Sequence, residues 1–396
     1  MYTLTTPGKG NIEEVLNLSQ KVFHETFARD ILAKEENFEY NNARIIIDES
    51  GSVVSTVFVI PRIMYMDSVE LKLGGIGGVA TDPSCRGKGY AGLLMKDAVD
   101  FMKQEHYDLS LLFPYSKDYY AKFGYRDYCP EIHSVPAAQS ALKNTQNINI
   151  REYSPAVDFD RVLNLYNSYC LSCIGPVKRS RAYLEQYLKK NENDIIKIFV
   201  AENKGQLYAY GMYGKMKKGA KADTWAAKML EYSFLHGRKS AMDLIFSAAM
   251  KEAAAEGHQL FYYEPLDNYS FEGSQPADHE KTIELDNKHL KMFRVIDFGS
   301  LFKKLKPLWD KRCGADIEKH FEFSYSSADY QGAAVIEGLE SGFSMRLEEK
   351  EFTGILLGFS AFSSLRAGSG FTPGEKELLN KIFPAKKPVF WDFDYL

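Results

Sequence analysis

The 396-residue sequence predicts an α/β and α+β protein built from three consecutive units. Residues 70–113 suit a strand, a helix and a second strand, which together form a βαβ unit. The order of helices and strands then repeats after a polar bridge at residues 141–149. Beyond residue 291, alternating strands precede helices, as in α+β domains. A chain of this length also exceeds what a single core ordinarily serves.

The first unit begins with short elements that precede the βαβ unit. Residues 1–5 suit an edge strand, and Asn11 caps a helix that runs through Phe27. Strands are expected at 43–48 and 53–60. Three acidic residues near the helix end and in the following loop are expected on the solvated surface, so they are weak candidates for substrate binding. They are Glu25, Asp30 and Glu35.

The most informative segment is a glycine-containing loop between the strand at 70–81 and the next helix. Pro83 ends the strand, and the loop reads Arg86-Gly87-Lys88-Gly89-Tyr90-Ala91. Its two glycines allow a tight turn in which consecutive amide N–H groups converge. The following helix, whose apolar side carries Leu94, Ala98 and Met102, adds free N-terminal amides and its dipole. The loop therefore predicts a site for an anion such as a diphosphate.

Other interpretations of this loop fit less well. A dinucleotide fingerprint needs G-x-G-x-x-G at the first strand of a domain and an acid about 20 residues later. This loop follows several strands, and its spacing is Arg-x-x-Gly-x-Ala. A Walker A loop needs a lysine followed by Ser or Thr, whereas Gly89 follows Lys88. A plain connecting turn remains the alternative.

A tyrosine-rich segment follows the second strand of the βαβ unit. That strand, at 109–113, is apolar, is ended by Pro114 and is expected to run parallel to the first across the helix. The segment reads Tyr119-Tyr120-Ala121-Lys122-Phe123-Gly124-Tyr125. Because the chain has 25 tyrosines, most of them are expected to pack or to lie on the surface.

The second unit repeats the element order but not the loop. The pattern predicts helices at 159–173, 180–189 and 240–256, and strands at 195–201, 207–214, 229–235 and 259–264. Where the glycine loop should recur, the sequence reads His236-Gly237-Arg238-Lys239-Ser240-Ala241. This segment has one glycine and lacks the spacing, so the second unit is expected to bind no coenzyme.

The third unit is expected to place a short sheet beside helices. Strands are predicted at 320–325, 333–337 and 342–348, and helices at 351–359 and 373–383. Apolar patterning of this kind more often builds a core than a lipid site. The chain ends with apolar side chains on one side of an extended strand, which predicts a docked terminus. These side chains are Val389, Trp391, Phe393 and Tyr395.

Composition excludes several classes of function. A formal net charge of −4 without a polybasic run argues against nucleic acid and against an anionic membrane as partners. No stretch approaches the roughly 20 apolar residues of a membrane span. The N-terminus lacks a basic region followed by an apolar core, so we expect no signal peptide and a cytoplasmic protein.

The five cysteines do not form a disulfide pattern, which agrees with a reducing compartment. Cys170 and Cys173 form a C-x-x-C pair, but the sequence has no second pair to complete a zinc site. The pair also ends a helical run, whereas a thioredoxin-like motif belongs at a strand-to-helix turn. Free thiols are therefore favoured over redox or metal chemistry, and no metal is expected.

The loop and the tyrosine segment together resemble a known family. The spacing Arg-x-x-Gly-x-Ala across Arg86, Gly89 and Ala91 resembles motif A of the GNAT acetyltransferases. The segment 119–125 resembles the Eis-type (enhanced intracellular survival) N-acetyltransferases, which are similar along the whole length. The resemblance implies a catalytic GNAT domain at 1–145, a GNAT-like domain without a coenzyme site at 146–287 and a sterol carrier protein-like domain at 288–396.

The resemblance also implies a reaction, direct acetyl transfer from acetyl-CoA to a primary amine in a ternary complex. The implied acceptors are small-molecule amines of the aminoglycoside or polyamine kind, or lysine side chains. Tyr120 matches the family's proton donor, and the C-terminal carboxylate of Leu396 matches its general base. The implied coenzyme-binding residues are Val79, Ala80, Thr81, Arg86, Gly87, Lys88, Gly89, Tyr90, Ala91 and Gly92. Relatives form hexamers, so a homo-oligomer is expected.

Two other functions remain open at this point. One is a carrier of lipids or other hydrophobic ligands that uses the third unit, and the other is a non-catalytic scaffold. The intact loop at Arg86 to Ala91 argues against both, because neither needs an anion cradle. Tyr119 also remains an alternative to Tyr120, because it is adjacent and can point into the same cleft.

Overall fold

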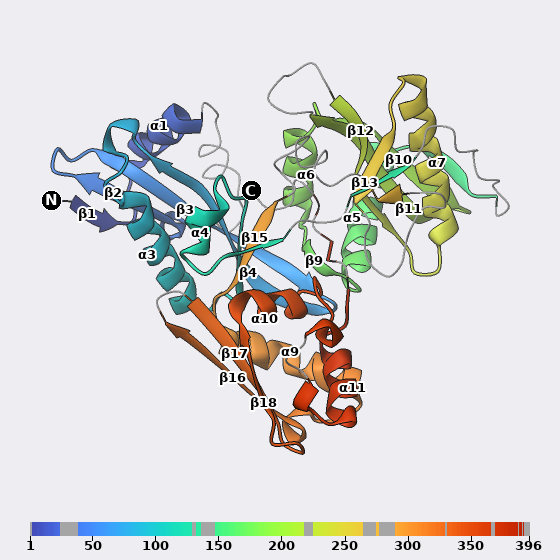
Figure 1. Ribbon diagram of the computed structural model, residues 1–396. Helices are drawn as coiled ribbons and strands as arrows, with labels where there is room; N and C mark the ends of the chain where they lie inside the picture. The colour runs from blue at the N-terminus through green and yellow to red at the C-terminus, as the bar shows by residue number, and fades with distance from the viewer. Residues whose placement is uncertain are drawn as a thin grey trace.

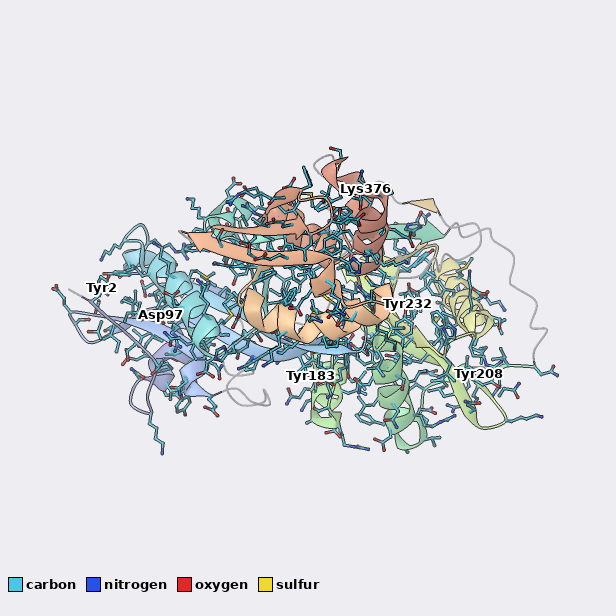
Figure 2. The ribbon with its side chains drawn as sticks, turned by 90° about the horizontal axis from the view of Figure 1, so that it is seen from below. Tyr2, Asp97, Tyr183, Tyr208, Tyr232 and Lys376 are labelled. Atoms are coloured by element: carbon cyan, nitrogen blue, oxygen red, sulfur yellow. The ribbon has the colours of Figure 1, made fainter. Side chains whose placement is uncertain are left out.

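A computed structural model describes most of the chain (Figure 1). The described residues are 2–23, 39–128, 132–135, 147–217, 225–263, 275–276, 290–328, 331–365, 369–386, 388–389 and 391. They form three sheets with helices beside them, which confirms the mixed fold class. Figure 2 shows the molecule from below, with Asp97 on a helix of the first part, Tyr208 and Tyr232 in the second part, and Lys376 in the third.

The first sheet contains the expected strands and two that come from elsewhere in the sequence. Its order is β1 (Tyr2–Thr5), β2 (Ala43–Asp48), β3 (Val53–Met66), β4 (Val69–Thr81), β5 (Leu109–Leu112), β15 (Lys291–Val295) and β6 (Arg126–Tyr128), with β9 (Ile174–Val177) also paired to β3. β3 is long, and between Val57 and Ile60 its side chains alternate between the two faces. Val57 and Val59 pack with α3 (Tyr90–Gln104), and Phe58 and Ile60 pack with α1 (Ile12–Phe23).

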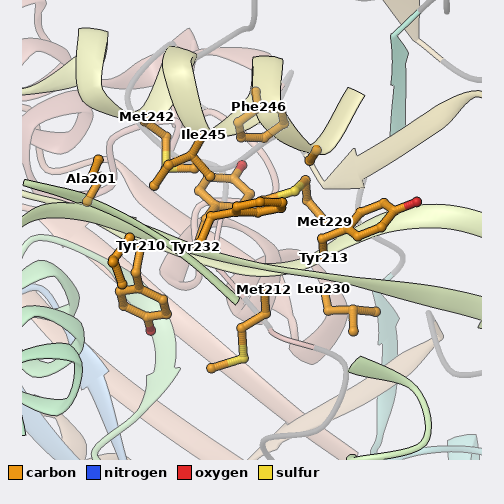
Figure 3. Packing of buried hydrophobic residues seen from close by; sticks show 14 of the residues in the cluster. Ala201, Tyr210, Met212, Tyr213, Met229, Leu230, Tyr232, Met242, Ile245 and Phe246 are labelled. Atoms are coloured by element: carbon orange, nitrogen blue, oxygen red, sulfur yellow. The ribbon is translucent and has the colours of Figure 1, made fainter. Parts of the chain in front are cut away.

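The second sheet repeats this plan. Its order is β14 (Gln275–Pro276), β7 (Ile132–Val135), β13 (Leu260–Tyr263), β12 (Trp225–Phe234), β11 (Gln206–Lys217), β10 (Ile195–Asn203) and β8 (Asn149–Glu152). The helices of this part are α5 (Pro155–Cys170), α6 (Arg181–Lys190) and α7 (Lys239–Ala255). Figure 3 shows the core, in which Met242, Ile245 and Phe246 of α7 face Met229 and Tyr232 of β12. The helices and strands predicted for residues 159–264 are thus present, with bounds shifted by a few residues.

Three strands join the sheet of a neighbouring part of the chain. β7 lies within the residues expected for the first domain, yet it pairs with β13 and β14 of the second sheet. β15 was expected to open the third domain, but it pairs antiparallel with β5 and β6 of the first sheet. β9, from the second unit, pairs with the end of β3. This exchange satisfies backbone groups that would otherwise lie at open sheet edges, and it ties the parts together.

The third part adds a three-stranded antiparallel sheet, in the order β16 (Phe321–Ala328), β17 (Gln331–Gly338) and β18 (Ser344–Glu348). Its helices are α9 (Phe298–Cys313), α10 (Glu349–Leu356) and α11 (Pro373–Ile382). α9 was not predicted from the sequence, and Pro307 lies inside it. It forms because Asp297 caps its N-terminus, Gly314 ends it at φ 66°, and Leu305 and Trp309 pack into a core shared with the first sheet.

The described part of the C-terminal segment is docked in the second domain. Val389 and Trp391 are buried in the core of the second sheet. The Val389 amide donates to the carbonyl of Ile174 in β9 at 2.7 Å, and the Trp391 ring packs edge-on against Tyr232 at 5.0 Å between centroids. Upstream, the Lys386 ammonium binds the Asp67 carboxylate at 2.5 Å. This agrees with the expected docking for the residues that are described.

Candidate active site

A cavity opens where two parallel strands separate. β4 and β5 pair from Leu73 opposite Leu109 to Ile76 opposite Leu112, and beyond these residues the strands diverge. The opening holds a cavity of about 980 Å³. Its walls come from the end of β4, the glycine loop, the start of α3, the segment after β5 and the end of α1. The glycine loop and the tyrosine segment, 29 positions apart at Tyr90 and Tyr119, therefore face one space.

A bulge in β4 shapes the wall of this cavity. Thr56 lies opposite Ala80 and Phe58 opposite Gly77, so β4 has one more residue than β3 across this stretch. Gly78 takes φ +58°, and a Cβ there would lie 2.1 Å from the Phe58 ring. Only glycine fits this position. The Thr56 hydroxyl donates to the displaced Gly78 carbonyl at 2.9 Å, which satisfies that group inside the protein.

The glycine loop is held by contacts on both sides. Gly87 and Gly89 have φ of 79° and 80°, and α3 begins directly after Gly89. Before the loop, the Asp82 carboxylate accepts from the amide of Ser84 at 3.0 Å and from the ammonium of Lys21 at 2.8 Å. The hydrogen bond from Lys21 lowers the pKa of Asp82 to about 2. Asp82 is therefore ionised at neutral pH, and it links α1 to the entrance of the loop.

Most of the predicted coenzyme-binding residues line the cavity, and two do not. The lining residues among them are Val79, Thr81, Arg86, Gly87, Gly89, Tyr90, Ala91 and Gly92. Ala80 points to the other face of the sheet and is 1% exposed in the core beside Phe58. The Lys88 side chain is exposed, with its ammonium 3.9 Å from the Cys85 sulfur. A role for these two in binding would have to come from the backbone or from a movement of the lysine.

Both candidate tyrosines reach the cavity from the short helix α4 (Lys117–Ala121). The Ser116 hydroxyl caps this helix by accepting from the Tyr119 amide. The rings of Tyr119 and Tyr120 pack edge-to-face at 5.1 Å between centroids. Tyr120 is 7% exposed, and burial raises its pKa well above the ordinary value, with smaller contributions from Tyr119 and Tyr125. The Tyr120 hydroxyl is therefore protonated at neutral pH.

Tyr125, the last tyrosine of the segment, has a structural role. Its side chain is fully buried, and its hydroxyl lies 2.7 Å from the Ser110 hydroxyl, which donates to the Gly74 carbonyl at 2.7 Å. This chain of hydrogen bonds connects the segment to β5 and β4. Burial raises the pKa of Tyr125 to about 12, although the bond to Ser110 lowers it. Tyr125 does not line the cavity, in agreement with the expectation that most tyrosines pack or lie on the surface.

One important residue escaped sequence reasoning. Arg294, in the exchanged strand β15, is 1% exposed and donates to the Phe123 carbonyl at 2.5 Å. This contact holds the chain three residues after Tyr120. Glu349 in α10 lies close enough to Arg294 to interact with its charge, and it accepts from the Tyr325 hydroxyl at 2.9 Å. Burial raises the pKa of Glu349, and Arg294 opposes this. The only sequence signal was an arginine between Phe293 and Val295 in a short strand.

Several sequence predictions concern residues outside the described part of the chain. Leu396, the expected source of the general base, is one of them, as are Glu25, Asp30 and Glu35. Among the described residues that line the cavity there is no carboxylate and no histidine. The polar side chains they offer are Thr81, Cys85, Arg86, Ser116 and the tyrosines.

Three further observations concern Cys170 and Cys173, metal ligands and membrane-spanning helices. Cys170 and Cys173 are both buried, and the Cys173 thiol donates to the Tyr169 carbonyl at 3.3 Å. Within the described residues no three His, Cys, Asp or Glu side chains gather as they would around a metal ion. In the same residues, no helix has both the length and the apolar composition needed to cross a membrane.

Comparison with known proteins identifies the part of the chain that forms this cavity. Residues 4–127 match the family model of the acetyltransferase (GNAT) domain. The first part of the chain is a GNAT acetyltransferase domain. The protein is accordingly an acyltransferase enzyme. The GNAT domain contains β4, the glycine loop, α3 and the tyrosine segment, so every described residue predicted for the site lies within it.

Solved structures resemble the whole chain at low identity. A probable N-acyltransferase from Enterococcus faecalis is 14% identical, with 99% of this chain and 100% of that chain covered at a TM-score of 0.70. A GCN5-related N-acetyltransferase from Anabaena variabilis is 12% identical, with 98% of each chain covered and a TM-score of 0.65. Eis1 from Mycobacterium abscessus is 11% identical, with 99% and 100% covered and a TM-score of 0.62. Similarity this low shows a shared fold over the full length. Among curated proteins, none matches this sequence.

Proposed function

We propose that this acyltransferase is an acetyl-CoA-dependent N-acetyltransferase of the Eis type that acetylates a primary amine. The observation that carries the proposal is the single cavity in which the glycine loop faces Tyr119 and Tyr120. An acyl-CoA transferase needs an anion cradle and a proton donor separated by the length of the reacting arm. The motif spacing and the full-length likeness to Eis1 support the Eis type.

The donor would bind along the open edge of β4. Its pyrophosphate would lie on the amides of Arg86 to Gly92, at the start of α3, where the helix dipole favours negative charge. The acyl arm would then run past Val79 and Thr81 toward α4. An amide near the β4 bulge would donate to the thioester oxygen as negative charge develops there. The bulge supports this step, because it takes part of the strand out of regular pairing with β3.

Transfer requires two proton movements. The acceptor ammonium loses a proton to a base, its nitrogen attacks the thioester carbonyl, and the carbon–sulfur bond then breaks. The departing thiolate takes a proton from the Tyr120 hydroxyl. The raised pKa of Tyr120 means that the hydroxyl is protonated before the step, and the same shift makes it a weaker acid, so its proton moves as the carbon–sulfur bond breaks and negative charge builds on the sulfur.

The base in this proposal is the C-terminal carboxylate of Leu396. Trp391 is the last described residue before it, and its burial against Tyr232 anchors the chain five residues from the end. The lack of a carboxylate or histidine among the described lining residues makes a base from elsewhere in the chain reasonable.

The remaining parts of the proposal follow the same resemblance. The domain limits are 1–145, 146–287 and 288–396, with the last part a sterol carrier protein-like domain that supplies the chain end. The acceptor is a small amine of the aminoglycoside or polyamine kind, or a lysine side chain. The enzyme acts in the cytoplasm as a homohexamer.

Thiol release from acetyl-CoA, measured against a panel of amines, tests the proposal most directly. At least one amine should raise release well above the rate of simple hydrolysis. If the protein binds coenzyme A but no amine on a broad panel does so, the N-acetyl transfer is wrong. For the base, a few residues added after Leu396 should abolish transfer without lowering Tm. A fully active extended protein would exclude the carboxylate.

A further inference from the structure

The helix that carries Tyr120 is too short to be stable by itself. α4 has five residues, Lys117–Ala121, whereas isolated helices shorter than about 12 residues are marginal in water. Its N-terminus is capped by the Ser116 hydroxyl. At its other end, the Phe123 amide donates to the Tyr120 carbonyl at 3.0 Å, and Gly124 turns the chain away at φ 78°. The position of Tyr120 therefore depends on what holds Phe123.

Arg294 holds Phe123 from a distant part of the sequence. Its guanidinium donates to the Phe123 carbonyl at 2.5 Å, and its side chain is buried. Phe123 is thus bonded to Tyr120 through its amide and to Arg294 through its carbonyl. A cation in this place is favourable, because the last carbonyls of a helix carry partial negative charge. Arg294 therefore fixes the end of α4 from outside the tyrosine segment.

A buried guanidinium needs an opposite charge, and α10 provides one. Glu349, the first residue of α10, is buried, and its carboxylate interacts with the charge of Arg294. The same carboxylate accepts from the Val295 amide at 3.3 Å and from the Tyr325 hydroxyl at 2.9 Å. These bonds connect it to β15 and β16. Arg294 and Glu349 both lie outside residues 4–127, which match the GNAT domain.

We propose that Arg294, supported by the charge of Glu349, is a positioning residue for acyl transfer. It holds α4 so that the Tyr120 hydroxyl lies where the departing sulfur needs a proton. The inference rests on the proposed role of Tyr120 as proton donor. Such positioning matters because a misplacement of about 1 Å can cost about 10²-fold in rate. The exchanged strand β15 and the third part of the chain thus complete a site whose other described residues belong to the GNAT domain.

The first test is Arg294→Met, which removes the charge and the hydrogen-bond donor and keeps a long side chain. kcat, measured by thiol release, should fall about tenfold or more, because the proton donor is no longer held in place. The KM for acetyl-CoA should stay nearly the same, since the glycine loop is held separately, through Asp82 and the start of α3. An unchanged kcat, or a KM that rises as much as kcat falls, would overturn the inference.

A double-mutant cycle with Tyr120→Phe separates positioning from general stability. If Arg294 acts through the Tyr120 hydroxyl, Arg294→Met should lower kcat in the unmodified protein and have little further effect in Tyr120→Phe. A residue that only stabilises the fold would lower kcat by the same factor in both backgrounds, and that result would contradict the proposal. Full turnover of Tyr120→Phe would remove the proton donor itself, so a failure of the proposed function is recognised without any change at Arg294.

A second variant excludes a folding defect as the explanation. Arg294→Met leaves Glu349 buried without its opposite charge, so its Tm should fall. Arg294→Met/Glu349→Gln removes both charges, and its Tm should lie above that of Arg294→Met while its kcat stays as low. If kcat recovered together with Tm, only stability would have been lost, and the inference would be wrong.

Arg179→Met is the matched control in the second part of the chain. Arg179 is also buried and pairs with Glu231 at 2.6 Å, and Glu231 accepts from the Tyr210 hydroxyl at 2.5 Å. At a temperature where the variant is folded, it should show a lower Tm and an unchanged kcat. A loss of kcat equal to that of Arg294→Met would show that any broken buried ion pair slows the enzyme, and it would overturn the special role of Arg294.

Discussion

The first and second sheets each contain a pair of parallel strands, and the residues beyond the two pairs have different surroundings. β4 and β5 pair up to Ile76 opposite Leu112, and a cavity follows. β12 and β13 pair up to Met229 opposite Tyr262. Three residues beyond Met229, Tyr232 packs against Trp391 of the C-terminal segment. A pair of parallel strands therefore does not make a site by itself, because side chains from elsewhere in the chain also pack beside it.

The loops that lead from the parallel strands β4 and β12 into α3 and α7 also differ. Before α3, Gly87 and Gly89 both take positive φ, which turns the backbone tightly into the helix. Before α7, only Gly237 does so, and Arg238 with φ −107° occupies the capping position. The sequence predicted this difference from the single glycine at 236–241. The second core instead contains Trp391 of the C-terminal segment. The end of this segment, at Leu396, is proposed to act as the base in the cavity of the first sheet.

Replacing Trp391 by Ala should have the largest effect on the stability of the protein. The loss of a fully buried indole should lower the free energy of unfolding by about 3–5 kcal/mol, measured by urea denaturation. Coenzyme binding should stay at one per chain, because removing the indole does not create a second glycine loop. A second bound coenzyme would contradict the distinction drawn between the two loops.

Trp309→Ala is the matched control for the C-terminal anchor. Trp309 is equally buried, in the core around α9, so its loss should cost a similar free energy of unfolding. Under conditions where both variants are folded, only Trp391→Ala should reduce turnover strongly, because only Trp391 anchors the chain end. Equal turnover in the two variants would remove the chain end from the mechanism.

Tyr120→Phe should slow turnover by about 10²-fold or more, because the thiolate loses its proton donor. The decrease should appear in kcat measured by thiol release, with little change in Tm. Tyr213→Phe in the second sheet also removes a buried tyrosine hydroxyl, and it should leave kcat as it is. Undiminished turnover of Tyr120→Phe would remove its assignment as proton donor.

Gly89→Ala should cost about 1 kcal/mol of stability, because alanine is strained at φ +80°. It should also weaken coenzyme A binding, since the loop amides can no longer converge. Gly205 in the second domain has the same φ of +80° and equally open surroundings. Gly205→Ala should lower the unfolding free energy by a similar amount and leave the Kd unchanged. Equal coenzyme affinity in both variants would show that the loop is only a connection.

The smallest expected effect is the difference in unfolding free energy between Tyr125→Phe and Tyr213→Phe, which each remove a buried hydroxyl. At neutral pH, Tyr125→Phe should cost about 1 kcal/mol because Ser110 loses its partner, whereas Tyr213→Phe should cost nothing. Burial raises the pKa of both to about 12, so the folded protein holds these protons more tightly. This stability is complete below the unfolded pKa of about 10 and is lost as pH rises toward about 12. Denaturant titrations should show a flatter decline in each variant than in the unmodified protein.

Local patterns in the sequence predicted the features that depend on neighbouring residues. Glycine spacing identified the loop before α3, apolar periodicity identified α3 and most strands, and one missing spacing distinguished the second unit from the first. These local predictions succeed because backbone angles, helix capping and side-chain periodicity depend on residues within a few positions along the chain. The tyrosine segment was recognised in the same way, and both candidate tyrosines line the cavity.

Only the tertiary structure decided the contacts between distant positions. β15 enters the first sheet and brings Arg294 to the Phe123 carbonyl, 171 positions away in the sequence. α9 forms around Pro307 because its apolar side is buried. Within the described residues, the Tyr119 hydroxyl has no hydrogen-bond partner, whereas the Tyr125 hydroxyl lies 2.7 Å from that of Ser110. The glycine spacing and the tyrosine segment in the sequence thus determined what kind of site the chain forms. Packing between remote segments determined where the cavity lies and which residues support it, because exclusion of water and pairing of buried polar groups depend on the whole fold.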